Sequence, residues 1–228
     1  MEDYAAARTK MVDSQLRTTD VTDYAVLAAM GEIPRERFVP ARMRPLAYID
    51  EDIPVKDGPV KDGSAGVPAR YLMEPAPFAR MVQLAEIAPS DIVLDIGCAT
   101  GYSTAVLARL ANSVVAVEVD AELAALAGST LVDLGIANAA VVTGPLEEGY
   151  PSEGPYDVIF VGGAAEVVPD GLFAQLKEGG RLVAVVGYGR AAAATVFTRT
   201  DGEIGSRIAF NAHVQPLPGF AKPKAFVF

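Results

Sequence analysis

Hydrophobic residues in the second half of the chain follow two alternating spacings. Short apolar runs, rich in Val, Ile and Leu, indicate buried strands at 91–97, 113–120, 139–144, 156–164 and 181–187. Between them, apolar residues recur every three or four positions, which predicts helices over 76–88, 102–111, 121–135 and 170–180. Strands and helices that alternate in this way favour an α/β fold, with a mostly parallel sheet flanked by helices.

The two ends of the chain show other patterns. Residues 11–30 contain two helix-compatible pieces separated by "TTD", and Thr19 or Asp20 is suited to cap the second piece. The prolines of "IPRERFVP" interrupt the helical pattern, and the Gly, Pro and Asp residues of 48–70 predict a long loop with one hairpin. Residues 194–217 predict a C-terminal antiparallel hairpin that turns at "TDGEIG".

Length and composition favour a single domain with one core. The 228 residues predict one domain over 1–228, with N-terminal helices and an active-site loop in 1–75 and an α/β core in 76–228. No apolar run approaches the roughly 18 residues of a membrane helix, and the charged first ten residues do not resemble a secretory signal. We therefore expect a cytoplasmic protein that is not bound to a membrane.

Charge and rare residue types limit the chemistry. A formal net charge of −10 would repel a phosphate backbone, so nucleic acid is not an expected partner. One cysteine and one histidine leave no material for an intrachain disulfide or a His/Cys metal cluster. Catalysis is therefore expected to proceed without a histidine base, and we interpret His213 as a structural or solvent-facing residue.

The stretch "VLDIGCATGYSTAVLA" (93–108) predicts a strand, a glycine turn and a helix, which is the usual ligand-binding unit of an open α/β sheet. Gly97 and Gly101 are spaced G-x-x-x-G, unlike the G-x-G-x-x-G of a dinucleotide site. Glu118 ends the next strand, where a carboxylate can accept hydrogen bonds from both ribose hydroxyls, and Asp95 precedes the turn. These features suit a ligand with a ribose and an amino acid group but no pyrophosphate, such as S-adenosyl-L-methionine.

Cys98 lies in this turn at a helix N-terminus, a position that lowers a thiol pKa. No second cysteine or neighbouring histidine supports a nucleophile or a redox sensor. We therefore interpret Cys98 as a small residue placed against the ligand.

Several segments together resemble the protein-L-isoaspartate O-methyltransferase family, over most of the chain. They are "MVDSQLRTTDVTDYAVLAAMGEIPRERFVP", "VLDIGCATGYSTAVLARL" and "YDVIFVGGAAEVVPDGLFAQLKEGGRLVAVVG". The resemblance implies a Rossmann-like methyltransferase fold that uses S-adenosyl-L-methionine and releases S-adenosyl-L-homocysteine. The residues that it implies around the cofactor are Asp95, Gly97, Cys98, Ala99, Thr100 and Gly101 at the methionine part, Glu118 and Val119 at the ribose, and Pro145 and Leu146 near the adenine, where family members usually carry Gly-Asp-Gly.

The chain departs from the family at its substrate-site motif. Alignment on Pro75 places Met73 where the family has a serine, followed by the acidic Glu74. One interpretation makes Met73 and Glu74 catalytic-site residues, with Arg70 and Pro75 contacting the substrate. The other makes this segment a plain helix entry, with Met73 packed beneath it and Arg70 a solvated loop residue.

The expected reaction is methylation of isoaspartyl carboxylates in a protein or peptide. A carboxylate with an ordinary pKa of about 4 is already ionised at neutral pH, so positioning is the main contribution of the protein. Three alternatives remain: a methyltransferase with a different acceptor, a non-catalytic module that binds the cofactor or its product, and a nicotinamide dehydrogenase, which the glycine spacing disfavours. The sequence does not indicate the oligomeric state.

Overall fold

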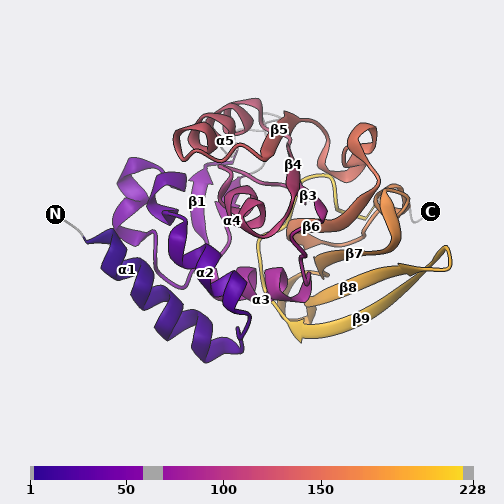
Figure 1. The fold of residues 1–228 in the computed structure, drawn as a ribbon, viewed down its shortest axis with the longest axis horizontal. Coiled ribbons are helices and arrows are strands. Elements are labelled where there is room, and N and C mark those ends of the chain that lie inside the picture. The colour runs from indigo at the N-terminus through magenta and orange to yellow at the C-terminus, as the bar shows by residue number, and fades with distance from the viewer. Residues whose placement is uncertain (1–2, 59–68, 223–228) are drawn as a thin grey trace, which may run out of the picture.

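The computed structural model describes residues 3–58 and 69–222. Its centre is a seven-stranded sheet in the order β5-β4-β3-β6-β7-β8-β9 (Figure 1). The strands are β3 (Ile92–Ile96), β4 (Ser113–Glu118), β5 (Ala139–Thr143), β6 (Tyr156–Ala165), β7 (Leu176–Val186), β8 (Ala193–Thr200) and β9 (Glu203–Asn211). Strands β3 to β7 pair in parallel, whereas β8 and β9 are antiparallel. The expected Rossmann-like α/β architecture with a C-terminal antiparallel hairpin is therefore confirmed.

Consecutive residues of the central strands point into two different hydrophobic clusters. Val93 and Val158 belong to one cluster, while Leu94 and Ile159 belong to the other. A parallel sheet that is covered on both faces requires this, and it explains why these strands read as continuous apolar runs. The helices are α3 (Pro75–Leu84), α4 (Tyr102–Leu110), α5 (Ala121–Asp133) and the short α6 (Asp170–Phe173).

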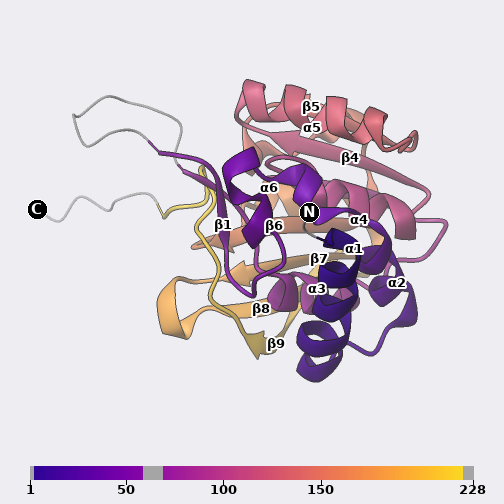
Figure 2. The same ribbon diagram turned by 90° about the vertical axis from the view of Figure 1, so that its left-hand side faces the viewer.

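The N-terminal segment packs beside α3 and α4 (Figures 1 and 2). It comprises α1 (Tyr4–Met11), a π-helical turn η1 (Val12–Leu16), the 3₁₀ turn η2 (Arg17–Thr19), α2 (Tyr24–Glu32) and the 3₁₀ turns η3 (Arg35–Phe38) and η4 (Ala41–Leu46). The predicted cap of the second helix is wrong. Asp23 caps α2 through its Oδ1, which accepts from the N–H groups of Ala25 and Val26, whereas Asp20 has a left-handed backbone.

The helix predicted over 170–180 is also wrong beyond its first turn. Only Asp170–Phe173 is helical, and the chain enters β7 at Leu176. Lys177 and Gly180 lie inside that strand, and a Cβ on Gly180 would lie 2.8 Å from the Lys177 carbonyl. The apolar spacing of this stretch fits both states, and pairing with β6 selects the strand.

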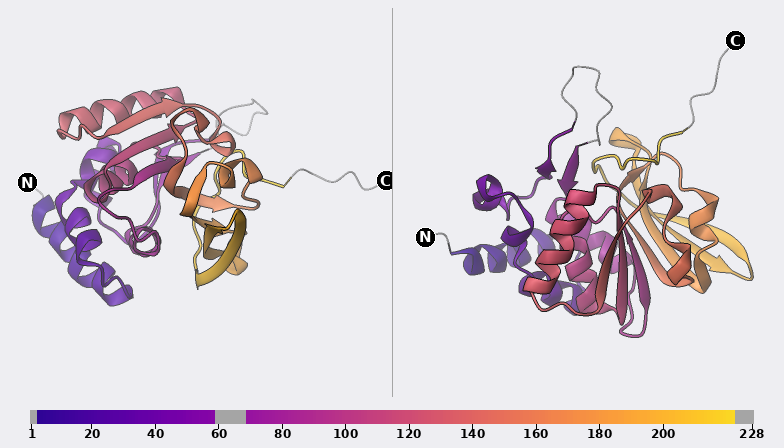
Figure 3. Two further views of the ribbon diagram at one scale, coloured as in Figure 1. Left: turned by 45° about the vertical axis from the view of Figure 1, so that its right-hand side comes forward. Right: turned by 90° about the horizontal axis from the view of Figure 1, so that it is seen from above.

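A second, two-stranded sheet lies next to the carboxyl ends of the central strands. It pairs β1 (Ile53–Lys56) with β2 (Arg70–Leu72), so the predicted hairpin in the long loop is confirmed, while residues 59–68 lie outside the described part. In Figure 2 the tail that follows β9 runs beside β1, and Figure 3 shows both from above. Within the described residues, the structure contains no helix that is long and apolar enough to cross a membrane.

Candidate functional site

The glycine turn between β3 and α4 forms the floor of the site. Gly97 and Gly101 have φ angles of +80° and +92°, in the left-handed region that favours glycine. Ala99 also has a positive φ of 49°. A Cβ on Gly97 would lie 2.8 Å from the Leu217 side chain, so this backbone is closely approached by another part of the chain. The two glycines therefore leave the turn without side chains, and Leu217 packs against Gly97.

Asp95, at the end of β3, is buried directly below the turn. Its Oδ2 accepts hydrogen bonds from the hydroxyls of Ser103 and Thr104, both at 2.7 Å. Its Oδ1 is buried and has no partner among the described residues. Burial raises the pKa of Asp95 to about 6, against the hydrogen bonds from Ser103 and Thr104, which lower it. An unsatisfied buried acceptor is costly, so a ligand donor would have a favourable place here.

Glu118, at the end of β4, is fully buried beside Asp95. Its Oε1 accepts from the N–H groups of Val119 at 3.1 Å and Asp120 at 3.2 Å, and its Oε2 accepts from the Ala99 N–H at 2.7 Å. Arg70 completes the set with a two-point contact, Nη2 to Oε2 at 2.8 Å and Nε to Oε1 at 3.2 Å. The carboxylate is thus held in place by the turn itself and by β2.

The space around these residues is almost filled. A cavity of about 20 Å³ lies beside Cys98 and Tyr71, and another of about 10 Å³ lies beside Arg70 and Leu217. Each has room for about one water molecule, whereas a nucleoside-sized ligand needs roughly 300 Å³ or more. The two carboxylates fit an aminoacyl nucleoside, because Asp95 has an unpartnered oxygen and Glu118 ends the neighbouring strand. In the described arrangement, the surrounding side chains fill the volume that such a ligand would need.

Other predicted cofactor residues serve the fold in this structure. The Thr100 hydroxyl donates to the Phe38 carbonyl at 2.6 Å, which ties the turn to η3. Cys98 is buried, and desolvation raises its thiol pKa well above the ordinary value. This corrects the expected lowering, because the loss of water outweighs the helix N-terminus. Leu146 begins η5 (Leu146–Glu148) directly after Pro145, and Leu146 is completely buried in the second hydrophobic cluster.

The segment from Met73 to Pro75 begins α3. Pro75 occupies the first turn, and Glu74 is the N-cap residue without a side-chain capping bond. Met73 is only 8% exposed, and its carbonyl accepts from Arg35 Nη2 at 2.6 Å. The helix-entry interpretation therefore describes Met73 to Pro75, and Glu74 also faces a pocket. Its expectation of a solvated Arg70 is wrong, because the Arg70 side chain is buried against Glu118.

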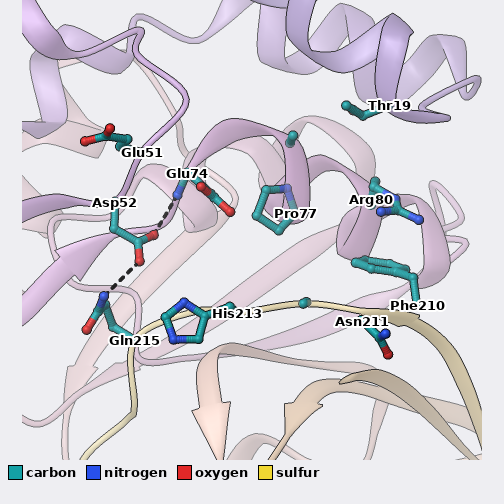
Figure 4. A pocket seen from close by; sticks show the side chains of 12 residues that line it. Thr19, Glu51, Asp52, Glu74, Pro77, Arg80, Phe210, Asn211, His213 and Gln215 are labelled. Atoms are coloured by element: carbon teal, nitrogen blue, oxygen red, sulfur yellow. Dashed lines mark hydrogen bonds between the residues drawn. The ribbon is translucent and has the colours of Figure 1, made fainter. Parts of the chain in front are cut away.

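That pocket has a volume of about 490 Å³ and is shown in Figure 4. Its lining residues are Thr19, Glu51, Asp52, Glu74, Ala76, Pro77, Arg80, Phe210, Asn211, Ala212, His213 and Gln215. Glu51, Asp52 and Glu74 lie at one end, and Arg80 lies at the other, over the Phe210 ring at 3.7 Å from its centre. Burial, together with nearby Asp52, raises the pKa of Glu74 to about 7.

Asp52 lies between this pocket and the small cavity beside Arg70. Its Oδ1 accepts from the Glu74 N–H at 2.9 Å, and its Oδ2 accepts from Gln215 Nε2 at 3.2 Å. Asp52 and Gln215 also line the small cavity that contains Arg70. The pocket and the Gly97 turn are therefore neighbours, with Met73 lining the small cavities between them.

The sequence did not single out Asp52, Arg80, Leu217 or the buried Arg35. Arg35 lies within "IPRERFVP", where Glu36 and Arg37 follow it directly, so no local pattern distinguishes the buried arginine from its charged neighbours. The others lie in loops or on a helix whose partners are distant in sequence. His213 is exposed at the pocket rim, in agreement with the solvent-facing interpretation.

Comparisons with known proteins agree with one another. A family model described as protein-L-isoaspartate(D-aspartate) O-methyltransferase matches residues 6–218. A relative of that name from Koribacter versatilis is 42% identical over 201 residues, covering 88% of this chain and 86% of its own. One from Gloeobacter violaceus is 38% identical over 208 residues, covering 91% and 96%.

Solved structures show the same fold. A protein-L-isoaspartate O-methyltransferase structure has a TM-score of 0.78 and 29% identity, covering 93% of this chain and 66% of its own. A Plasmodium falciparum structure, named as a β-aspartate methyltransferase in complex with S-adenosyl-L-homocysteine, has a TM-score of 0.72 at 17% identity. It covers 94% of this chain and 98% of its own.

Proposed function

This chain belongs to the protein-L-isoaspartate(D-aspartate) O-methyltransferase family, and from that premise we propose that it methylates isoaspartyl carboxylates of proteins or peptides in the cytoplasm. The cofactor of the family is S-adenosyl-L-methionine, which supplies an electrophilic methyl group when bound and leaves as S-adenosyl-L-homocysteine. The observation that carries the proposal is the buried pair of Asp95 and Glu118 beside the Gly97 turn, with one Asp95 oxygen unpartnered among the described residues.

We assign the cofactor residues by position. Asp95 Oδ1 is suited to the ammonium of the methionine part, and the backbone of Gly97, Cys98, Ala99, Thr100 and Gly101 allows close approach. Glu118 and Val119 would hold the ribose, and Pro145 with Leu146 would lie against the adenine. The convergence of strand ends at one edge of a parallel sheet supports the places of Asp95 and Glu118. The other assignments are what membership of the family implies for the matching positions.

We assign the acceptor side to the segment from Arg70 to Pro75. An isoaspartyl carboxylate is ionised at neutral pH, so the site does not need a base to activate it. The contribution of the protein is to orient the carboxylate and to exclude water, and Met73 provides an apolar wall for this. With a pKa of about 7, Glu74 is partly protonated at neutral pH, which weakens its repulsion of an anionic acceptor.

The experiment is transfer of labelled methyl from S-adenosyl-L-methionine to an isoaspartyl peptide, compared with the same peptide carrying ordinary aspartate. We expect base-labile incorporation into the isoaspartyl peptide alone. Asp95→Asn should reduce transfer, while Asp133→Asn, a surface change at an exposed ion pair with Arg37, should leave it unchanged. Cofactor binding without methylation of either peptide would refute the proposed substrate.

The pocket in Figure 4 favours a second candidate, which keeps the cofactor and changes the acceptor. Glu51, Asp52 and Glu74 give one end of that pocket a negative character that suits an acceptor with a cationic group. In that case amine-bearing carboxylates should be methylated faster than the isoaspartyl peptide, and Met73→Ser should create or raise isoaspartyl activity. An unchanged rate in Met73→Ser would count against this candidate.

A further inference from the structure

Arg70 holds the carboxylate that the proposed function assigns to the cofactor ribose. Its guanidinium contacts both oxygens of Glu118, at 2.8 and 3.2 Å, and its Nη2 also donates to the Gly97 carbonyl at 3.0 Å. The side chains of Arg70 and Glu118 are 4% and 0% exposed. Such a planar, two-point contact is the strong form of an arginine–carboxylate pair.

This contact uses up the acceptor capacity of Glu118. A carboxylate offers about four lone-pair positions. Three backbone N–H groups, of Ala99, Val119 and Asp120, and two guanidinium contacts already supply five donors to these positions. A ribose diol would donate two hydrogen bonds to the same oxygens, so Arg70 and the ribose compete for Glu118.

The guanidinium also occupies the space next to the turn. A Cβ built on Gly97 would lie 3.1 Å from Arg70 Nη2 and 2.8 Å from Leu217 Cδ2. The space that Gly97 leaves by having no side chain is thus occupied by Arg70 of β2 and by Leu217 of the C-terminal tail. The cavity that Arg70 lines has only about 10 Å³ of free volume.

The element that carries Arg70 lies outside the central sheet. Among the described residues, strand β2 (Arg70–Leu72) pairs with β1 alone, and their ladder has a register shift between Pro54 and Lys56. A two-stranded sheet is marginally stable on its own. Arg70 can therefore leave Glu118 without breaking a strand pair of the central sheet.

We propose that Arg70 is an affinity-setting residue of the cofactor site: an internal guanidinium that occupies the ribose position at Glu118 and is displaced when the cofactor binds. The inference rests on the proposed function, because it takes the S-adenosyl-L-methionine site to be at Glu118. It adds that a residue of this chain contacts the carboxylate that the ribose would use, so that binding is an exchange of partners at one carboxylate.

The test is calorimetric titration of the full chain with S-adenosyl-L-homocysteine, for the wild type and Arg70→Met. Met keeps most of the stem of Arg70 and removes the competing charge. If the open form is a minor population of roughly 1–10%, the variant should bind about tenfold or more tightly. Arg181→Met is the matched control, because it removes another largely buried arginine–carboxylate pair, with Asp91 at 2.8 Å, at the amino ends of the central strands.

Stopped-flow association gives a second readout. In the wild type, the observed rate should reach a plateau at high ligand concentration, where departure of Arg70 becomes limiting. In Arg70→Met the rate should rise linearly over the same range. In a Glu118→Gln background, Arg70→Met should no longer tighten binding, because the two residues act on the same contact.

The outcomes distinguish the role of Arg70 from the assignment of the cofactor site to Glu118. Equal or weaker binding by Arg70→Met, with a wild type that binds, overturns the role of Arg70 and leaves the proposed function intact. If neither protein binds S-adenosyl-L-homocysteine, the assigned cofactor site is wrong and the inference fails with it. Should Arg70→Met fail to fold, Arg70→Lys replaces it, with an intermediate gain expected because one ammonium cannot contact both oxygens as a guanidinium does.

Discussion

The hydrogen bond between the cofactor turn and the N-terminal segment gives a quantitative prediction for Thr100→Val. The Thr100 hydroxyl is buried and donates at 2.6 Å to the carbonyl of Phe38, which is itself buried. Valine has nearly the same shape, so the change removes the donor and leaves the packing in place. The Phe38 carbonyl then loses its hydroxyl partner in a site that water does not reach.

The magnitude follows from that loss. A buried acceptor that is left without its partner costs about 1–3 kcal/mol, so we expect Thr100→Val to lower the free energy of unfolding by about 2 kcal/mol. For a chain of this length, each kcal/mol corresponds to roughly 2–4 °C in Tm. The expected decrease is therefore about 4–8 °C. Thr100→Ser keeps the hydroxyl and loses one methyl, which should cost about 0.8 kcal/mol.

Urea unfolding followed by circular dichroism measures both variants. Thr130→Val is the matched control, because the Thr130 hydroxyl donates to Leu126 O, the carbonyl one helical turn before it. That carbonyl is within an α-helix and keeps its backbone partner, so we expect a change of less than about 0.5 kcal/mol. If Thr100→Val and Thr130→Val are equally stable, the turn is not held by the Phe38 carbonyl and the reasoning is wrong.

Two further predictions concern titrating side chains. The pKa of Glu74 is about 7 in the folded chain and 4.5 ordinarily, so its favourable contribution is complete below about pH 4.5 and is lost as the pH rises through 7. Glu74→Gln should therefore be more stable than the wild type by about 1 kcal/mol at about pH 8, a value reduced for solvent screening because Glu74 is half-exposed. Urea unfolding should show no gain in stability for Glu74→Gln at about pH 4. The exposed control Glu203→Gln should show no gain. Cys98 is buried with a raised thiol pKa, so a thiol reagent should label it only in denaturant. Rapid labelling of the folded chain would contradict the burial of the thiol.

Much of the cofactor side could be predicted from the sequence because its determinants are local. The strand before Gly97, the helix that starts at Tyr102 and the acid at Glu118 each follow from spacing along the chain. Parallel pairing then brings the ends of β3 and β4 together, since the order of strands and helices leaves few alternatives. Asp95 and Glu118 were placed at one edge for that reason.

The contacts that close the site could not be predicted, because they join distant segments. Arg70 and Glu118 are 48 residues apart, and no periodicity connects them. Leu217 reaches Gly97 across an even longer stretch of chain. The pKa of the Cys98 thiol could not be predicted for a related reason. The sequence shows that Cys98 lies at a helix N-terminus, but it does not show that the thiol is buried. Burial determines the direction of the pKa shift.

Strand β9 has a consequence for behaviour in concentrated solution. It is an edge strand of the seven-stranded sheet and extends from Glu203 to Asn211, with Ile204 and Ile208 exposed. A long edge strand has unpaired N–H and C=O groups that can pair with an extended segment of another chain. Such pairing is the first step of edge-to-edge aggregation. Charged Glu203 and Arg207 stand next to the two isoleucines, and the register shift in the pairing with β8 disturbs a flat approach. The colloidal stability of the protein therefore depends on a few surface charges along one strand, quite apart from the residues that serve methyl transfer.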